Sequence, residues 1–358
     1  INGTGVRTLA GNGNINVDVD AGDLTINAVV TAHGSGTVTL NADAGTVDIN
    51  AVVSSTTGVI DITGDVVTQD ANITTGGAGT VDVTADNGSI TMADGTTTTS
   101  VNGAITYDAT ASVALSQLQT ANTSTVSVTA TAGAISDNLT AETANITTGT
   151  ATLLAALGIG SGAAPADLET DVTTIDARNT GLTGDIQINE VAAGTAIDVQ
   201  RLAQTNPLGA GNILLTTEAG TITVLVGGQG VTTLGTGTIT LTAVGGTSDV
   251  LVNNVVTSTT GTIQVNAGRD ITTTAIISAT GAGNIDLNAV RDIGQGANIT
   301  SAGGVITADA GTGSITMTDG TLTSTSGAGT IAYTAAINVA VSQLQTANTS
   351  TVSVTATA

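Results

Sequence analysis

Apolar and polar residues alternate along many short segments of this chain, and most of these segments begin with glycine. GTVTLN at 36–41, GTVDIN at 45–50 and GTITLT at 237–242 are three examples. Strict alternation over four to six residues is typical of a β-strand that buries one face, whereas an apolar helix face repeats every three or four residues. The pattern therefore predicts an all-β protein built from short strands.

Alternation also predicts which side chains face the core, because successive residues of a strand point to opposite sides. We expect the polar neighbours Thr39, Asp48, Asp61, Asp82 and Thr91 to face outward. The residues that we expect to point inward are Val38, Leu40, Val47, Ile49, Ile60, Ile62, Val81, Val83, Ile90, Met92, Ile239, Leu241, Ile263, Val265, Ile285, Leu287, Ile315 and Met317.

The glycine-led segments recur at a nearly constant interval. The glycine-led segment at Gly58 is followed 21 residues later by the one at Gly79, and NAGRDI at 266–271 returns 22 residues later as NAVRDI at 288–293. Such an interval, with two or three short strands in each, is typical of one coil of a β-solenoid. We therefore predict a parallel β-solenoid with coils of about 22 residues. The rival fold is an antiparallel β-sandwich, whose modules of ~100 residues would not repeat at this interval.

A longer repeat contains the shorter one. SQLQTANTSTVSVTATA occurs at 116–132 and returns unchanged at 342–358, and upstream segments recur at nearly the same offset. Both ends fall inside this repeat, so we expect the natural chain to continue in both directions, because repeat arrays normally end in atypical caps. The chain divides into a first solenoid copy at 1–132, a less regular solenoid segment at 133–226 and a second copy at 227–358.

The middle segment departs from the alternation. LLAAL at 153–157 predicts the start of a short helix or an apolar turn. The segment 158–166, which contains Pro165, predicts a loop, and Pro207 predicts another, because proline cannot donate to a strand ladder. SQLQTAN at 116–122 also interrupts the alternation, and we interpret it as a lateral bulge or as loop filler.

The composition indicates a thin core. The chain has 358 residues with no Phe, Trp or Cys and only two Tyr, so Val, Ile, Leu and Ala must supply almost all of the buried surface. Without cysteine, neither disulfides nor thiolate metal sites can form. The most apolar segment, 153–159, is too short to cross a bilayer, and we expect no membrane insertion.

Charge is strongly one-sided, with 28 Asp and Glu against five Arg and a net charge of −23. This excess would repel phosphate backbones and anionic lipid headgroups, which argues against nucleic acid as a partner. We interpret it as a solvated acidic coat, or as a surface for divalent cations. Carboxylates stacked ~4.8 Å apart on successive coils repel unless they are screened. Salt should therefore favour stability or self-association, and Ca²⁺ should do so more strongly where it has real sites.

Candidate catalytic and metal-binding residues are few. His33 is the only histidine, and its surroundings predict an exposed turn rather than a catalytic triad or a zinc site. Asp61 and Asp82 are one coil interval apart and would stack on adjacent coils, and Asp48 and Asp286 hold similar outward positions. These four aspartates are the candidates for Ca²⁺, although the sequence has neither an EF-hand loop nor a Gly-Gly-x-Gly-x-Asp repeat.

Some β-solenoids degrade polysaccharides, so enzymatic activity has to be weighed. Glycosidase chemistry needs two carboxylates at a defined separation in a groove, usually beside aromatic rings that stack on sugars. The chain lacks such rings, and we expect no enzyme and no catalytic or cofactor-binding residue; a groove lined by three or more convergent carboxylates would favour the enzyme. Threonine runs at 96–99 and 272–274 raise ice binding, but the residue type changes at equivalent positions of successive coils.

The glycine-led coils, with GRDI at 268–271 and VRDI at 290–293 between them, resemble the repeats of filamentous haemagglutinin-like bacterial exoproteins. The resemblance implies a right-handed parallel β-helix at the cell surface, used for adhesion or matrix. We therefore expect an extracellular structural protein that forms part of a surface fibre, giant adhesin or matrix filament. Its expected partners are further copies, joined end to end or laterally, and a host or neighbouring cell surface or a matrix polysaccharide. The alternatives are a cell-envelope sheath filament and a carbohydrate-acting β-helix enzyme.

Overall fold

The computed structural model describes residues 1–160, 166–192, 194, 196–347 and 350–357. These residues form strands, turns and loops and contain no helix, as the alternation predicted. Among them there is accordingly no helix with the length and apolar character needed to cross a bilayer.

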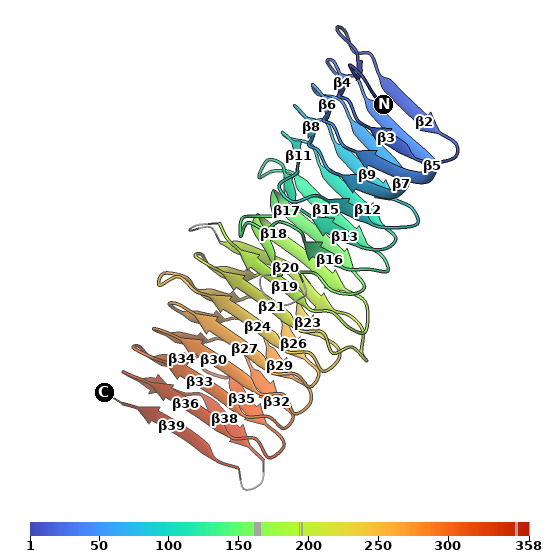
Figure 1. The fold of residues 1–358 in the computed structure, drawn as a ribbon. Helices are drawn as coiled ribbons and strands as arrows, with labels where there is room; N and C mark the ends of the chain where they lie inside the picture. Colours follow the sequence, from blue (N-terminus) through green and yellow to red (C-terminus); the bar gives the residue numbers. More distant parts are fainter. Residues whose placement is uncertain (161–165, 193, 195, 348–349, 358) are drawn as a thin grey trace. The chain divides into compact units, whose positions relative to one another are not determined.

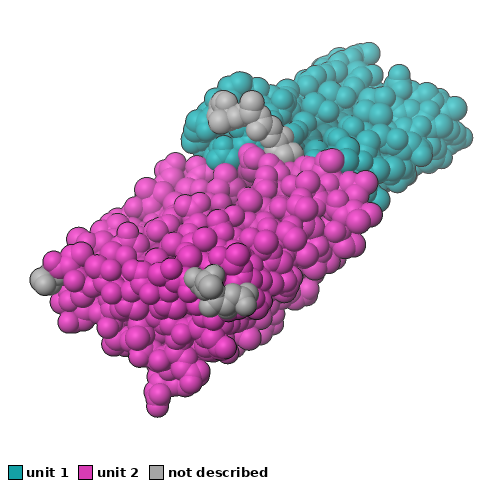
Figure 2. Space-filling view, turned by 90° about the horizontal axis from the view of Figure 1, so that it is seen from below, with its two compact units in different colours: residues 1–173 teal, residues 174–358 magenta. Residues whose placement is uncertain are grey.

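The chain divides into two compact units, Ile1–Thr173 and Thr174–Ala358, which Figure 2 shows in different colours. The boundary falls inside the less regular segment at 133–226, so the first sequence copy belongs to one unit and the second copy to the other. In each unit the chain winds as a β-solenoid, with the strands of successive coils side by side (Figure 1).

In the first unit each regular coil contributes three strands, which lie on the matching strands of the next coil. For example, β9, β10 and β11 pair with β12, β13 and β14. The strands are β1 (Val6–Arg7), β2 (Ile15–Val19), β3 (Leu24–Ile26), β4 (Val30–Ala32), β5 (Val38–Ile49), β6 (Val53–Ser55), β7 (Ile60–Gln69), β8 (Ile73–Thr75), β9 (Val81–Ala85), β10 (Ile90–Met92), β11 (Thr97–Ser100), β12 (Ile105–Ala109), β13 (Val113–Leu115), β14 (Gln117–Gln119), β15 (Thr125–Ala130), β16 (Ile135–Asp137) and β17 (Ile146–Ala155), followed along the chain by β18 (Leu168–Asn179).

The second unit repeats this plan. There β24, β25 and β26 pair with β27, β28 and β29, which pair in turn with β30, β31 and β32. The strands are β19 (Ile186–Glu190), β20 (Ile197–Gln204), β21 (Ile213–Thr217), β22 (Ile222–Val224), β23 (Gly230–Thr233), β24 (Ile239–Ala243), β25 (Val250–Val252), β26 (Val256–Ser258), β27 (Ile263–Ala267), β28 (Ile271–Thr273), β29 (Ile277–Ala279), β30 (Ile285–Ala289), β31 (Ile293–Gln295), β32 (Ile299–Ser301), β33 (Ile306–Ala310), β34 (Ile315–Met317), β35 (Leu322–Thr325), β36 (Ile331–Ala335), β37 (Val339–Ala340), β38 (Gln343–Thr346) and β39 (Val352–Ala356).

The register of the strands confirms the predicted solenoid. Ile60 pairs with Val81 and Ile186 pairs with Ile213, which is one coil later in each case, and both pairings are parallel. Coils average about 23 residues, close to the predicted interval. Parallel pairing at this interval rules out the antiparallel sandwich for the described residues.

Every residue predicted to face inward is buried, from Val38 in the first unit to Met317 in the second. Equivalent positions of successive coils stack on one another, so the core is a column of branched aliphatic side chains, the type that packs best on a pleated surface. One such column in the second unit includes Ile239, Ile263, Ile285, Ile306 and Ile331, which are register partners on successive coils.

Two local predictions were wrong. LLAAL at 153–157 does not start a helix, because residues up to Ala155 belong to β17 and pair in parallel with β15. Leu153 is buried and Leu154 is half-buried, so the strand alternates although nearly every residue in it is apolar. SQLQTAN at 116–122 is neither a bulge nor filler: it contains β14, the third strand of its coil, which buries Leu118. A strand of three residues with one inward side chain is too short to show a period.

A stack of glycines explains why the alternating segments begin as they do. A methyl group on Gly261 would lie 1.9 Å from the carbonyl oxygen of Gly237, one coil earlier. Any side chain at this corner would push the two coils apart, so the corner requires glycine. The same approach, within 1.8–2.2 Å, recurs through the second unit at Gly211, Gly237, Gly261, Gly283, Gly304 and Gly329.

Both tyrosines are buried, and each is held in the core of its own unit by an equivalent set of hydrogen bonds. The hydroxyl of Tyr107 donates to Gln69 Oε1 at 2.6 Å and lies 2.7 Å from Thr98 Oγ1. In the second unit the hydroxyl of Tyr333 has the same relation to Gln295 and Thr323, at 2.6 and 2.7 Å. Burial raises the pKa of Tyr333 to about 12 and that of Tyr107 further. The two sequence copies therefore share their buried hydrogen bonds as well as their strands.

Candidate functional site: charged clusters on the coils

The aspartates chosen as metal candidates occupy different rows of the solenoid. Asp61 and Asp82 are register partners on β7 and β9, as predicted, and burial together with the Asp82 charge raises the pKa of Asp61. Asp48 lies between Thr25 and Thr68, in a different row of the same unit. Asp286 belongs to the second unit and accepts a hydrogen bond from Thr307. The structure thus brings together two of the four candidates, and that pair supplies only two carboxylates.

His33 lies in an exposed turn between β4 and β5, where the sequence predicted it. Its Nδ1 atom is 3.0 Å from the carbonyl oxygen of Gly11, and its backbone N–H donates to Thr8 Oγ1 at 2.7 Å. These contacts join the turn to the preceding coil.

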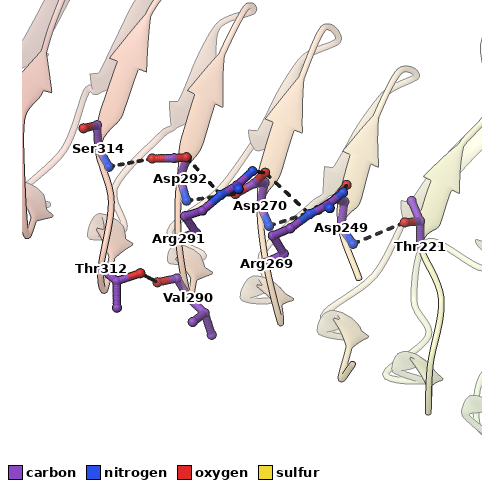
Figure 3. Close-up of polar contacts among 9 residues, drawn as sticks. All are labelled: Thr221, Asp249, Arg269, Asp270, Val290, Arg291, Asp292, Thr312 and Ser314. Carbon is purple, nitrogen blue, oxygen red and sulfur yellow. Dashed lines mark hydrogen bonds and ion pairs between the residues drawn. The ribbon is translucent and has the colours of Figure 1, made fainter. Parts of the chain in front are cut away.

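The arginines of the GRDI and VRDI motifs form a ladder on the second unit (Figure 3). Arg269 Nε donates to Asp249 Oδ1 at 2.7 Å, and Arg291 Nε donates to Asp270 Oδ1 at 2.8 Å, so each arginine binds the aspartate one coil earlier. A second guanidinium nitrogen pairs with the other carboxylate oxygen in both cases. The hydrogen bond with Arg291 is the main reason why the pKa of Asp270 is lowered.

The aspartates of this ladder also bind backbone. Asp249 accepts from the N–H of Asp270 at 3.1 Å, Asp270 accepts from the N–H of Asp292 at 3.1 Å, and Asp292 accepts from the N–H of Ser314 at 2.8 Å. Each carboxylate therefore ties its own coil to the next, and the two arginines offset two of the three negative charges (Figure 3). The arrangement stabilises coil stacking, which is a structural role for the RDI motif.

A different cluster lies in the first unit, beside the excursion between β16 and β17, residues 138–145. Two contacts fix the start of this excursion to a coil 46 residues earlier: Asn138 Nδ2 donates to the carbonyl of Met92, and Thr140 donates to Asp94 through its backbone N–H and its hydroxyl. The backbone hydrogen bond from Thr140 is the main reason why the pKa of Asp94 is lowered. The excursion is therefore an ordered strap across the coils.

Asn145 fixes the other end of the strap. Its backbone N–H donates to the carbonyl of Glu169 at 2.9 Å, and its side-chain oxygen accepts from the N–H of Glu169 at 3.0 Å. Its Nδ2 donates to Asp137 Oδ1 at 2.6 Å and to the carbonyl of Ser116 at 3.0 Å. Because Asn145 is fully buried, these bonds hold β16, β18 and the strap together.

Glu169 is the unusual residue of this cluster. Alternation breaks at the start of β18, where Leu168, Glu169 and Thr170 are all buried, and Glu169 is only 1 % exposed. Neither of its carboxylate oxygens has a hydrogen-bond partner among the described residues. Burial first, and then the charges of Asp137, Asp167 and Glu142, raise its pKa to about 8.

Three carboxylates converge here. Oxygens of Glu142 on the strap and of Asp167 and Glu169 around the start of β18 all lie within 4.8 Å of one another, with Glu142 exposed and Asp167 half-buried. Sequence reasoning missed this cluster. Asp167 and Glu169 lie close together in one acidic stretch, which was a visible signal, but nothing in the sequence indicated that the strap would bring Glu142 to them.

A second acidic group, Asp18, Asp20 and Asp43, is exposed at the opposite end of the first unit's sequence. Its members are solvated, so they need no further ligand.

Comparisons of the chain with protein-family models, with curated proteins and with solved structures found no match. Function therefore has to be argued from the coils and their charged clusters.

Proposed function

We propose that this chain is a structural repeat protein, part of an extracellular surface fibre, giant adhesin or matrix filament. One observation carries the proposal: like residues stack in register over successive coils, in the aliphatic column and the glycine corner and, in the second unit, in the aspartate ladder. Repeat solenoids of this kind are built of units that contact only their neighbours, so they extend by adding coils.

The location and partners are inferred from the same features. The resemblance of the coils to filamentous haemagglutinin-like exoproteins supports a place at the bacterial cell surface. An acidic, cysteine-free surface with a net charge of −23 suits contact with other copies under screening ions rather than with nucleic acid. Further copies, a neighbouring or host cell surface and matrix polysaccharide are the proposed partners, and a cell-envelope sheath would use the same lateral packing.

Sedimentation velocity and negative-stain electron microscopy over a salt series test the proposal. Stacked carboxylates such as Asp61 and Asp82 repel less as the Debye length falls from ~30 Å at ~0.01 M salt to ~3 Å at ~1 M. We expect larger species and filaments as salt rises, and the double variant Asp61→Asn/Asp82→Asn should assemble at lower salt than wild type. Gly246→Ala, which changes no charge, serves as the control. A single monomeric species under every condition would contradict the proposal.

The convergent carboxylates favour one second candidate, a carbohydrate-acting enzyme. A glutamate with a pKa of about 8 beside other carboxylates has the protonation state of a general acid at neutral pH. Against this, Tyr107 and Tyr333 are the only Phe, Tyr or Trp residues of the chain, and both are buried, so no such ring is exposed for a sugar. Release of reducing ends from neutral and acidic polysaccharides by wild type, but not by Glu169→Gln, would establish the enzyme.

A further inference from the structure

We propose that Glu142, Asp167 and Glu169 form a Ca²⁺ site that clamps the 138–145 strap onto β18. The inference does not depend on the filament proposal, because it concerns one cluster of the first unit. It also differs from the expectation of cations between stacked aspartates, since none of Asp48, Asp61, Asp82 and Asp286 belongs to this cluster.

The state of Glu169 is what points to a ligand. A buried carboxylate normally accepts several hydrogen bonds, because an unpaired charge away from water is costly. Glu169 is almost completely buried, and its two oxygens have no partner among the described residues while they face two further carboxylates. A cation among the three oxygens would supply the missing partner and turn mutual repulsion into ligation.

The chemistry of the site selects the cation. All the side-chain ligands are carboxylate oxygens, the donors that hard cations such as Ca²⁺ and Mg²⁺ take, and no histidine or cysteine lies in the cluster. Mg²⁺ keeps several waters and is usually held by only one or two protein carboxylates, so three converging carboxylates fit Ca²⁺ better. The exposed side at Glu142 leaves room for waters to complete six to eight ligands.

The strap already holds both ends of the site in place. Thr140 is bound to Asp94, and Asn145 is bound to the backbone of Glu169, so Glu142 lies on a short segment between two anchored points. Little chain entropy is lost when such a segment binds a cation. Ca²⁺ would add a third attachment in the middle of the strap and neutralise most of the charge that Glu142, Asp167 and Glu169 concentrate there.

Isothermal titration calorimetry with CaCl₂ on the full chain tests the site. Glu142→Gln alters an exposed side chain and leaves the fold intact, and Glu169→Gln removes the buried ligand. Asp108→Asn is the matched control, since it removes one negative charge from an exposed position of β12 in the same unit. We expect one site in wild type and in the control, about ten-fold or more weaker in Glu142→Gln and lost in Glu169→Gln, with MgCl₂ binding more weakly than CaCl₂.

Proton release provides a second readout that a merely structural role for Glu169 would not produce. The groups that face Glu169 are Asp137 on β16, Glu142 on the strap and Asp167 before β18. Ligation requires the ionised carboxylate, so titrations at about pH 7 in two buffers of different ionisation enthalpy should show proton release on Ca²⁺ binding in wild type and in Asp108→Asn, and no Ca²⁺-dependent proton release in Glu169→Gln, which has lost the site. Equal Ca²⁺ binding by wild type, Glu142→Gln and Glu169→Gln would overturn the proposal, as would the absence of a Ca²⁺ heat in wild type.

Discussion

Replacement of Gly261 by alanine tests the coil-stacking account at one atom. The added methyl would lie 1.9 Å from the carbonyl oxygen of Gly237, and ordinary contact begins at 3.4 Å, so the two coils would have to separate by more than an ångström. Ile239 N donates to the carbonyl of Thr262 at 2.9 Å, directly beside this corner. A displacement of that size breaks this hydrogen bond, and loss of a buried bond together with overpacking costs at least about 3 kcal/mol.

Gly246→Ala is the matched control, because an added methyl there meets no atom within 4 Å. A Gly→Ala change at an unstrained site stabilises a protein by up to about 1 kcal/mol through the unfolded chain, so this variant should be as stable as wild type or slightly more. Urea unfolding followed by far-ultraviolet circular dichroism measures both variants. An unfolding free energy for Gly261→Ala within about 0.5 kcal/mol of wild type would refute the stacked-glycine argument.

Three further comparisons address the polar groups. Tyr107→Phe should lower the free energy of urea unfolding by about 1–3 kcal/mol, because Gln69 and Thr98 lose their hydrogen-bond partner inside the core. Tyr333→Phe should lower it by the same amount, and unequal losses would contradict the equivalence of the two sets of hydrogen bonds. Arg201→Met should destabilise the second unit by about 1–3 kcal/mol, because it leaves the partly buried Asp176 unpaired. Arg291 is more exposed, so Arg291→Gln should cost less, and its effect should vanish in high salt. A larger loss of stability in Arg291→Gln than in Arg201→Met would contradict the link between burial and the strength of these ion pairs. In chelator, the thermal midpoint of wild type should fall relative to Glu169→Gln as the pH rises from 4.5 to about 8, because the fold holds this carboxyl protonated while the unfolded chain ionises; parallel pH profiles would refute the raised pKa.

Local alternation was sufficient to predict the strands and their core residues, and the coil interval was sufficient to predict the solenoid. Val38 and Leu40, or Ile285 and Leu287, are each flanked by polar residues, so a period of two is visible within five positions. Leu153 and Leu154 defeated the same reasoning, because both are apolar although only Leu153 faces the core. In such a strand the pairing with the neighbouring coil decides which side chains face the core, and the residues of that coil are distant in sequence.

The Glu169 cluster was unpredictable for a related reason. Its residues come together only because Asn138 and Thr140 bind a coil 46 residues earlier and Asn145 binds β18, and these contacts depend on where the strap crosses the coils. By contrast, the Asp61–Asp82 pair followed directly from the coil interval. Contacts between equivalent positions of neighbouring coils are readable from a repeat, whereas contacts made by a departure from the repeat are not.

Fibre diffraction from aligned assemblies of the chain tests the central claim, a structural role through coil stacking, most directly. Parallel coils that stack along a filament place strands ~4.8 Å apart along its axis. The account predicts filaments at high salt with a meridional reflection near ~4.8 Å. Filaments without this axial repeat would contradict it, and so would a chain that stays monomeric and releases sugar in a manner that depends on Glu169.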